Sequence, residues 1–363
     1  MLRPSKTIWS LEPHTLAKHL ILRRYLHAWL PIISSRNQKV LFLDGFAGPG
    51  IYAGGEEGSP VIAMKALIEH AHRHVIKAKV MFLFIEANKK RSETLASVIE
   101  PLKAQLPEGS SASVVHGEYA PLLSQTLEDL ATAGKQLAPS LVFIDPFGVK
   151  GLTMDLVRRV LATRSCEVLL NFMVGYAHRF IAAPEFEKPL DAIFGTPRWQ
   201  EGRDLAGHAR VDFLRRLYIE ELSRTDVCGR AEYARAFSML DESQRPIYDL
   251  VFATNHPQGI DKMKDALWKV DGSGGERFSD ATDPGQATLL DDSVEHDQGL
   301  LALLRDAFAG QTVTWPQTEE FIRRSPYRIL KRPLLKAAKD PASGIRIQSD
   351  TRGLTALSRI TFI

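Results

Sequence analysis

The sequence predicts an α/β fold built on a parallel sheet, followed by a small, mainly helical domain. Short apolar runs recur between residues 39 and 172, as is typical of strands buried on both faces. Segments with helical periodicity separate these runs, which indicates βαβ units. A stretch at 271–299, rich in Gly, Ser and acidic residues, then predicts a linker.

The expected strands and helices follow from these runs in chain order. We expect strands at 39–44, 79–86, 112–118, 141–145 and 166–172. The expected helices cover 13–32, 60–72, 88–102, 121–134 and 154–163. Pro31 is expected to end the first helix, and Ser59 to cap the second ahead of Pro60.

The pattern changes after residue 178. A helical insert is expected at about 178–225, then a β-hairpin at 230–240 and 246–254, then a helix at 256–270. This organisation predicts a large domain at 1–270, an acidic linker at 271–299 and a small domain at 300–363. Three helices followed by two short strands give the small domain the outline of a winged helix-turn-helix.

The composition is that of an ordinary globular protein, with 44% hydrophobic and 25% charged residues. A net charge of +3 does not by itself indicate a nucleic-acid partner. Cys166 and Cys228 match no paired spacing, so we expect neither disulfides nor a metal site, and a reducing cytoplasmic location. No apolar run approaches ~20 residues, so we expect no membrane partner.

A glycine-rich loop follows the first expected strand, in the string LDGFAGPG. It lacks the lysine of a phosphate-binding P-loop and the spacing of a dinucleotide fingerprint. An acidic residue, a short gap and Gly-x-Gly fit an S-adenosylmethionine (SAM) site best. Asp44, Phe46, Gly48 and Gly50 are therefore candidate cofactor residues. The alternative is a tight strand–helix turn that binds nothing.

Two more acidic residues strengthen the cofactor prediction. Glu86 ends the second strand, where its carboxylate can accept hydrogen bonds from ribose hydroxyls, and Glu118 follows the third, near the expected adenine. Each is also compatible with a solvated strand end. Together they place acidic groups at the edge where open α/β sheets bind ligands.

The fourth strand ends in Asp145-Pro146-Phe147-Gly148, which resembles the [DNS]PP[YFW] motif of amino-methyltransferases acting on nucleic-acid bases. In that chemistry the carboxylate orients an exocyclic amine and the aromatic ring stacks on a flipped base. Phe147 replaces the second proline, and Gly148 stands where the aromatic residue usually lies. The alternative is a strand stop with Phe147 in the core. The loop has no cysteine for cytosine C5 chemistry.

Several longer strings resemble the family of three-Cys-motif partner (TcmP) proteins over roughly residues 10–275. They include PHTLAKHLILRRYLHAWLP, FLDGFAGPGIY, IDPFG and IYDLVFATNHPQGIDKMKDALWKV. The resemblance implies a Rossmann-like class I SAM-dependent methyltransferase fold, with a winged-helix extension found in some members. It also implies a partner, a three-Cys-motif protein that is iron–sulfur and radical-SAM-like.

Basic residues at two places are candidates for contact with nucleic acid or the partner. Lys18 lies in the first helix, and residues 323–339 hold seven basic residues and no acid. The candidates in that second segment are Arg323, Arg324, Arg328, Lys331 and Arg332. The alternative for Lys18 is a plain packing helix, and the alternatives for 323–339 are a solvated helix face or a protein-docking surface.

The function predicted from these features is SAM-dependent methylation of an exocyclic amine of a nucleic-acid base. DNA is favoured slightly over RNA. Asp145, Pro146 and Phe147 would form the catalytic loop. Two alternatives stay open: a methyltransferase of a protein or small molecule, and a non-catalytic scaffold for the three-Cys-motif protein.

Overall fold

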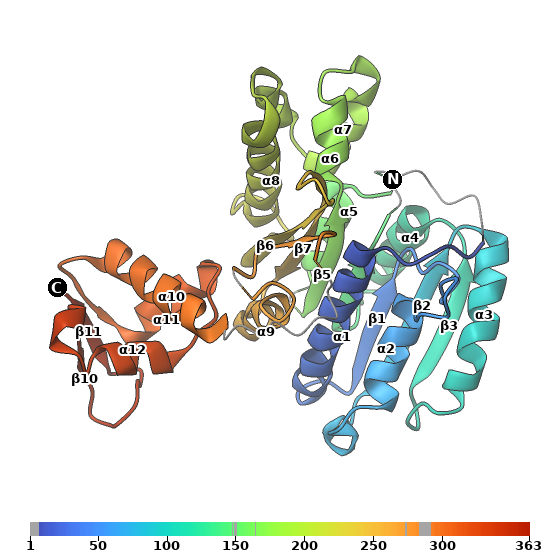
Figure 1. Ribbon diagram of the computed structural model, residues 1–363. Helices are drawn as coiled ribbons and strands as arrows, with labels where there is room; N and C mark the ends of the chain where they lie inside the picture. The colour runs from blue at the N-terminus through green and yellow to red at the C-terminus, as the bar shows by residue number, and fades with distance from the viewer. Residues whose placement is uncertain (1–6, 147, 149–150, 164, 273, 283–291) are drawn as a thin grey trace. The chain divides into compact units, whose positions relative to one another are not determined.

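The computed structural model describes every residue except 1–6, 147, 149–150, 164, 273 and 283–291. The chain divides into two compact units (Figure 1). The first comprises residues 1–262 and 277–284, and the second 263–276 and 285–363. No helix in the described part of the chain is both long and apolar enough to cross a membrane.

The first unit is built on an eight-stranded sheet with the order β3-β2-β1-β4-β5-β7-β6-β8. Neighbouring strands from β3 to β5 run parallel, whereas β7 is antiparallel to both β5 and β6. This is a Rossmann-like α/β sheet, as the sequence predicts. The strands are β1 (Lys39–Asp44), β2 (Lys79–Glu86), β3 (Ser111–His116), β4 (Ser140–Ile144), β5 (Cys166–Phe172), β6 (Tyr233–Leu240), β7 (Pro246–Thr254) and β8 (Arg277–Ser279).

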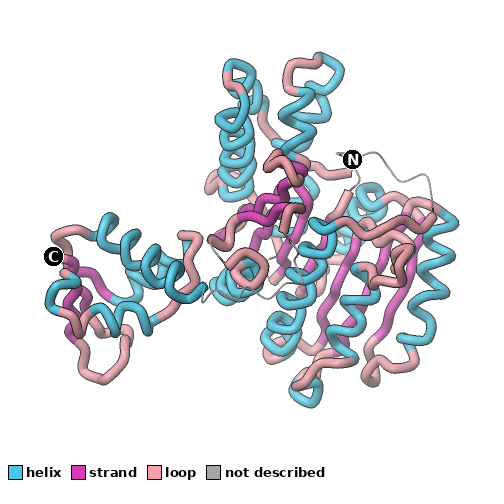
Figure 2. Tube along the Cα trace, viewed as in Figure 1, coloured by secondary structure: helices cyan, strands magenta, loops and turns pink. Residues whose placement is uncertain are grey.

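Helices cover both faces of the parallel part of the sheet (Figures 1 and 2). Leu41 and Leu43 of β1 face the core that includes α4 and α5, while Val40 and Phe42 point the other way and are also buried. The helices α1, α2 and α3 cover that second face (Figure 1). Their bounds are α1 (Pro13–Ser34), α2 (Ser59–Ile68), α3 (Lys89–Lys103), α4 (Tyr119–Thr132) and α5 (Met154–Leu161), with a short 3-10 helix η1 (Arg73–Val75).

The predicted helical insert and hairpin follow β5. The insert contains α6 (Val174–Phe180), η2 (Pro184–Phe186), α7 (Glu187–Phe194), η3 (Pro197–Asp204) and α8 (Gly207–Ser223). The hairpin is β6 and β7, and α9 (Pro257–Leu267) comes after it. Within 271–299, the segment expected as a linker, the structure contains β8 and the first residues of α10.

Pro31 does not end α1, which continues to Ser34. Proline has no N–H, so the carbonyl of His27, four residues earlier, loses its partner inside the helix. The Nε2 of His70 donates a hydrogen bond to this carbonyl at 2.8 Å. The Nδ1 of the same ring accepts from the backbone N–H of His72 at 3.0 Å. The helix therefore passes through a proline because a tertiary bond satisfies the freed carbonyl.

Replacing His70 by alanine should lower the free energy of unfolding by about 1–3 kcal/mol, because the His27 carbonyl then lacks a donor. In a Pro31→Ala background the loss should shrink, since residue 31 then supplies an N–H. Urea denaturation of the four proteins of this double-mutant cycle measures the difference. An equal loss in both backgrounds would contradict the compensation.

The second unit contains the three helices and the hairpin expected at its end, and one strand that was not expected. Its elements are α10 (Asp292–Phe308), β9 (Thr312–Thr314), α11 (Trp315–Arg324), α12 (Lys331–Ala337), η4 (Pro341–Ser343), β10 (Ile345–Gln348) and β11 (Arg359–Phe362). The strands form an antiparallel sheet in the order β10-β11-β9. Buried Leu304, Trp315 and Ile360 belong to its apolar core.

A buried lysine closes the C-terminal end of α11. Lys264 is 0% exposed, and its Nζ donates to the backbone carbonyls of Ile322 (2.8 Å), Arg323 (3.1 Å), Ser325 (3.3 Å) and Tyr327 (2.6 Å). Carbonyls at this end of a helix lack intrahelical partners and carry partial negative charge. The ammonium therefore satisfies several of them at once.

Lys264→Met should destabilise the second unit by about 2–4 kcal/mol, because the carbonyls lose their donor while the side-chain volume is kept. Lys269→Met, at an exposed position close by, is the matched control and should have little effect. Thermal and urea denaturation of both variants tests this. Equal stability of the two variants would show that the carbonyls do not depend on Lys264.

Candidate functional site

Four polar side chains lie at the same edge of the sheet, where parallel strands end. Asp44 ends β1, Glu86 ends β2, Asp145 follows β4, and Asn171 is the next-to-last residue of β5. Because the strand order is β2-β1-β4-β5, these residues come from adjacent strands. The order of the chain reverses between β1 and β4, and open α/β sheets bind ligands at such a point.

Asp44 shapes the loop after β1 from inside. It is 0% exposed, and its carboxylate accepts from the backbone N–H of Phe46 at 3.0 Å and from Ser59 Oγ at 2.6 Å. Ser59 therefore bonds Asp44 instead of capping α2, whose N-cap residue is Gly58. The pKa of Asp44 is raised to about 7, chiefly by burial. The charge of Asp145 contributes to the rise, while the hydrogen bonds and Lys18 oppose it.

The two predicted glycines of this loop adopt left-handed backbone conformations, with φ of +63° at Gly48 and +79° at Gly50. A Cβ on Gly50 would lie 2.7 Å from Leu95 Cδ1, so α3 approaches the loop closely. The backbone N–H of Gly48 donates to Glu86 Oε2 at 3.0 Å, and that of Asn88 donates to Oε1 at 2.7 Å. Glu86 thereby ties the loop to β2.

A cavity of about 480 Å³ opens beside this loop. Its volume lies within the usual range of small-molecule sites. Three of the predicted cofactor residues line it, namely Phe46, Glu86 and Glu118. Asp44, Gly48 and Gly50 are not among its lining residues and act by shaping the loop.

Tyr119 is a cavity residue that the sequence did not single out. Its ring lies 5.4 Å from that of Phe46, and a Cβ on Gly45 would come within 2.3 Å of it. Gly45 is therefore required for this aromatic wall. The Tyr119 hydroxyl is buried and has no hydrogen-bond partner within the described part of the chain. Its position directly after Glu118, at the start of α4, was the available signal.

Asp145 is held by two buried donors. Lys18 Nζ, from α1, forms an ion pair with Oδ2, and Asn171 Nδ2 bonds Oδ1. Lys18 and Asn171 are each 3% exposed. Pro146 is buried, and Gly148 has φ of +96°, a conformation that favours glycine where the related motif has an aromatic residue. Phe147 lies outside the described residues.

An aromatic and histidine shell surrounds Lys18. Its Nζ lies 5.5 Å from the centre of the Tyr248 ring. His14 Nδ1 lies 2.9 Å from Asp280 Oδ2. Burial, with smaller effects of Lys18 and Arg23, lowers the pKa of His19 to about 3, so its ring is neutral near pH 7. No local sequence motif predicts that Tyr248 or Asp280 belongs to this site, because only the tertiary fold brings them here.

Lys18 does not lie on a surface, which corrects the expectation that it contacts nucleic acid or a partner. Its amphipathic helix covers the sheet, and its ammonium points at Asp145 instead. The sequence pattern could not distinguish an inward from an outward lysine.

The basic segment of the second unit is largely engaged within that unit. Arg323 pairs with Glu319 and Glu320, and Arg324 also pairs with Glu320. Arg328 lies over the Trp268 ring at 5.5 Å, and Lys331 donates to the Leu354 carbonyl at 2.8 Å. Arg332 is exposed. The sequence prediction counted charges only over 323–339. It therefore left out Glu319 and Glu320, one helical turn earlier, which pair with these arginines.

Comparisons with known proteins found no matching family model and no matching curated protein. A solved Legionella pneumophila protein assigned to the family model DUF519 is 13% identical, covering 71% of this chain and 92% of its own, with a TM-score of 0.41. An O-methyltransferase from Bacillus cereus in complex with SAH is 14% identical, covering 64% and 80%, with a TM-score of 0.32. The fold assignment rests on the strand order, not on these loose likenesses.

Asp44 should make stability depend on pH. Its pKa in the folded protein, about 7, exceeds the ordinary value of 3.8, so the folded state binds the proton more tightly. Relative to Asp44→Asn, the wild type should therefore be most stable below pH 4 and lose stability as pH rises to 7, by up to a few kcal/mol. Urea denaturation across this range measures the difference.

The exposed Asp204→Asn is the control and should show no such trend. A difference between wild type and Asp44→Asn that stays constant from pH 4 to 7 would show that Asp44 is ionised throughout.

Proposed function

We propose that the chain is a SAM-dependent methyltransferase that modifies an exocyclic amine of a nucleic-acid base, with DNA ahead of RNA. The observation that carries the proposal is the carboxylate of Asp145, oriented by Lys18 and Asn171 at the same sheet edge as Glu86. Glu86 lines the cavity, whereas Asp145 is not among its lining residues. Glu86 and Asp145 end strands that are two apart in the sheet, roughly 10 Å. An acceptor nitrogen and a methyl donor fit between them.

The residues of the cavity suit SAM. Each oxygen of Glu86 accepts one backbone hydrogen bond and keeps a lone pair for a ribose hydroxyl. Phe46 and Tyr119 form an apolar wall for a flat ring. The Tyr119 hydroxyl has no hydrogen-bond partner among the described residues. Glu118, which also lines the cavity, would accept from an adenine amino group. When bound, SAM supplies a methyl group on a positively charged sulfur.

The protein's part in such a transfer is alignment. Each Asp145 oxygen already accepts one hydrogen bond, and its remaining lone pair can accept from an amine N–H. That bond would aim the nitrogen lone pair at the methyl group, where positioning lowers the barrier. The proton lost from nitrogen would pass to Asp145 or to water. In this proposal Pro146 stiffens the turn and Phe147 stacks on the base.

The wider assembly is part of the proposal. The element order α10-β9-α11-α12-β10-β11 is that of a winged helix, which would dock nucleic acid or the three-Cys-motif partner. The internal pairing of Arg323, Arg324 and Lys331 favours a second candidate, a methyltransferase of a protein or small molecule. A scaffold without catalysis is the remaining alternative.

Incubation with methyl-labelled SAM and, separately, DNA, RNA and the three-Cys-motif protein tests the function. Asp145→Ala should keep SAM binding and lose transfer by about 10²–10⁴-fold, since it removes the orienting carboxylate. Glu86→Ala should instead weaken SAM binding, measured by calorimetry. Asp204→Ala is the exposed control.

The distribution of label decides between the candidates. Label in DNA or RNA that depends on Asp145 supports the base methyltransferase. Label in protein favours the second candidate. Failure of the wild type to bind SAM would exclude the enzyme and leave the scaffold.

A further inference from the structure

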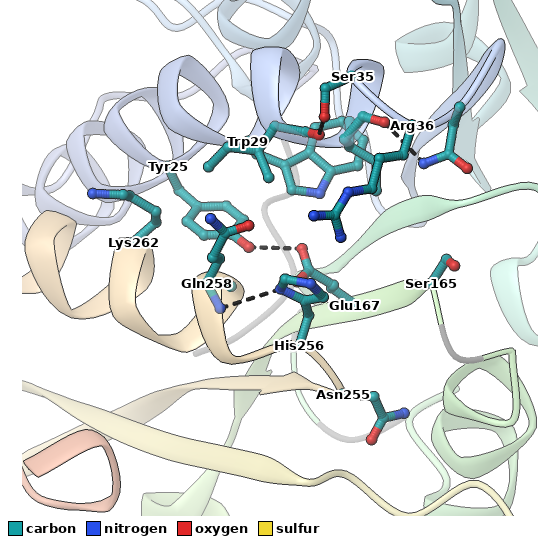
Figure 3. Close-up of a pocket in the computed structure, with 14 residues that line it drawn as sticks. Tyr25, Trp29, Ser35, Arg36, Ser165, Glu167, Asn255, His256, Gln258 and Lys262 are labelled. Carbon is teal, nitrogen blue, oxygen red and sulfur yellow. Dashed lines mark hydrogen bonds between the residues drawn. The ribbon is translucent and has the colours of Figure 1, made fainter. Parts of the chain in front are cut away.

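A second cavity, of about 350 Å³, lies at the opposite edge of the same sheet, where β5 begins and β7 ends (Figure 3). Residues of α1 and of the first turns of α9 complete its wall. Its residues are distinct from those of the first cavity, and no step of the proposed methyl transfer uses them.

Glu167 contributes a buried carboxylate to this cavity and is only 6% exposed. Tyr25 Oη donates to its Oε2 at 2.6 Å, and Thr254 Oγ1 donates to its Oε1 at 2.7 Å. Burial raises the pKa of Glu167, and interactions with Tyr25, Thr254 and Trp29 oppose the shift. Each oxygen keeps a lone pair for a further donor. Burying a carboxylate beside an open cavity costs free energy unless its remaining lone pairs also accept hydrogen bonds.

Trp29 contributes a further donor, directed at Glu167, to the same place. It lies one helical turn after Tyr25 on α1, so both rings line the cavity. Its indole Nε1 is buried and faces Glu167 without completing a hydrogen bond in the described structure (Figure 3). Buried indole N–H groups usually find a partner. A ligand that offers an acceptor beside a donor would satisfy Trp29 and Glu167 together.

The mouth of the cavity is basic. Arg36 is exposed, points into the cavity, and forms no ion pair with a described carboxylate (Figure 3). Lys262 of α9 is a second cation among the lining residues. Guanidinium groups recognise phosphate with high affinity.

These features together select a ligand class. The Glu167 carboxylate would repel a simple anion, and Arg36 and Lys262 would repel a simple cation. A wholly apolar molecule would leave the Trp29 N–H and Glu167 unsatisfied. A nucleoside monophosphate has a flat ring with adjacent donors and acceptors at one end and an anion at the other. We propose that this cavity binds a nucleoside monophosphate, with the base edge at Trp29 and Glu167 and the phosphate at Arg36 and Lys262.

Calorimetric titration of the full chain with AMP, GMP, CMP and UMP tests the site, with S-adenosylhomocysteine present to compete for the first cavity. At least one nucleotide should bind in the micromolar range. Arg36→Ala should weaken that binding about ten- to a hundredfold, because a charge-assisted contact is lost. Trp29→Phe should weaken it about tenfold.

Arg24→Ala is the matched control, because Arg24 is an exposed arginine of α1 that does not line the cavity. It should bind like the wild type. The proposal is overturned if none of the four nucleotides binds at millimolar concentration, if inorganic phosphate binds as tightly, or if Arg36→Ala and Arg24→Ala bind alike. Abolition of binding by Glu86→Ala, with Arg36→Ala unaffected, would place the nucleotide in the first cavity and also overturn it.

Discussion

The ion pair between buried Lys18 and the partly exposed Asp145 is the constraint around which the sheet edge is organised. An ammonium that is 3% exposed is stable only beside an anion, so α1 must lie where Lys18 reaches the loop after β4. Asn171 fixes the second carboxylate oxygen from β5. One helix and two strands therefore converge on a single carboxylate. The same pairing gives Asp145 a fixed direction, which a group that orients a substrate requires.

The acidic residues of this edge have the same chemistry but different tasks, and burial separates them. Asp44 is enclosed, its oxygens engaged by Ser59 and the Phe46 N–H, and its pKa rises to about 7. Glu86 also accepts two backbone hydrogen bonds, yet it lines the cavity. Equivalent positions at two strand ends thus hold one carboxylate that builds the loop and one that can contact a ligand.

Local sequence predicted the parallel strands and most helices, because uninterrupted apolar runs and helical periodicity are themselves local. It failed where a distant residue decided the outcome. Pro31 continues a helix because His70, far along the chain, bonds the His27 carbonyl. Ser59 bonds Asp44 instead of capping, and Lys18 points inward. In the candidate site the strand-end acids were predictable from position. Tyr119 was missed although it directly follows Glu118. Tyr248 and Asp280 were not predictable, because only packing brings them there.

The Asp145 carboxylate and the second cavity share α1 and β5 as supports, and this fixes their spacing. Glu167 and Asn171 are four residues apart on β5, roughly 13 Å along the strand. On α1, Lys18 serves one edge while Tyr25 and Trp29 serve the other, seven to eleven residues later. Residues along this span, including Ile21, Leu22 and Leu26, are at most 1% exposed, so the helix cannot slide without breaking buried contacts. A rigid α1 therefore holds Asp145 and Glu167 at a fixed separation. A displacement at one end of the helix must then be transmitted to the other end.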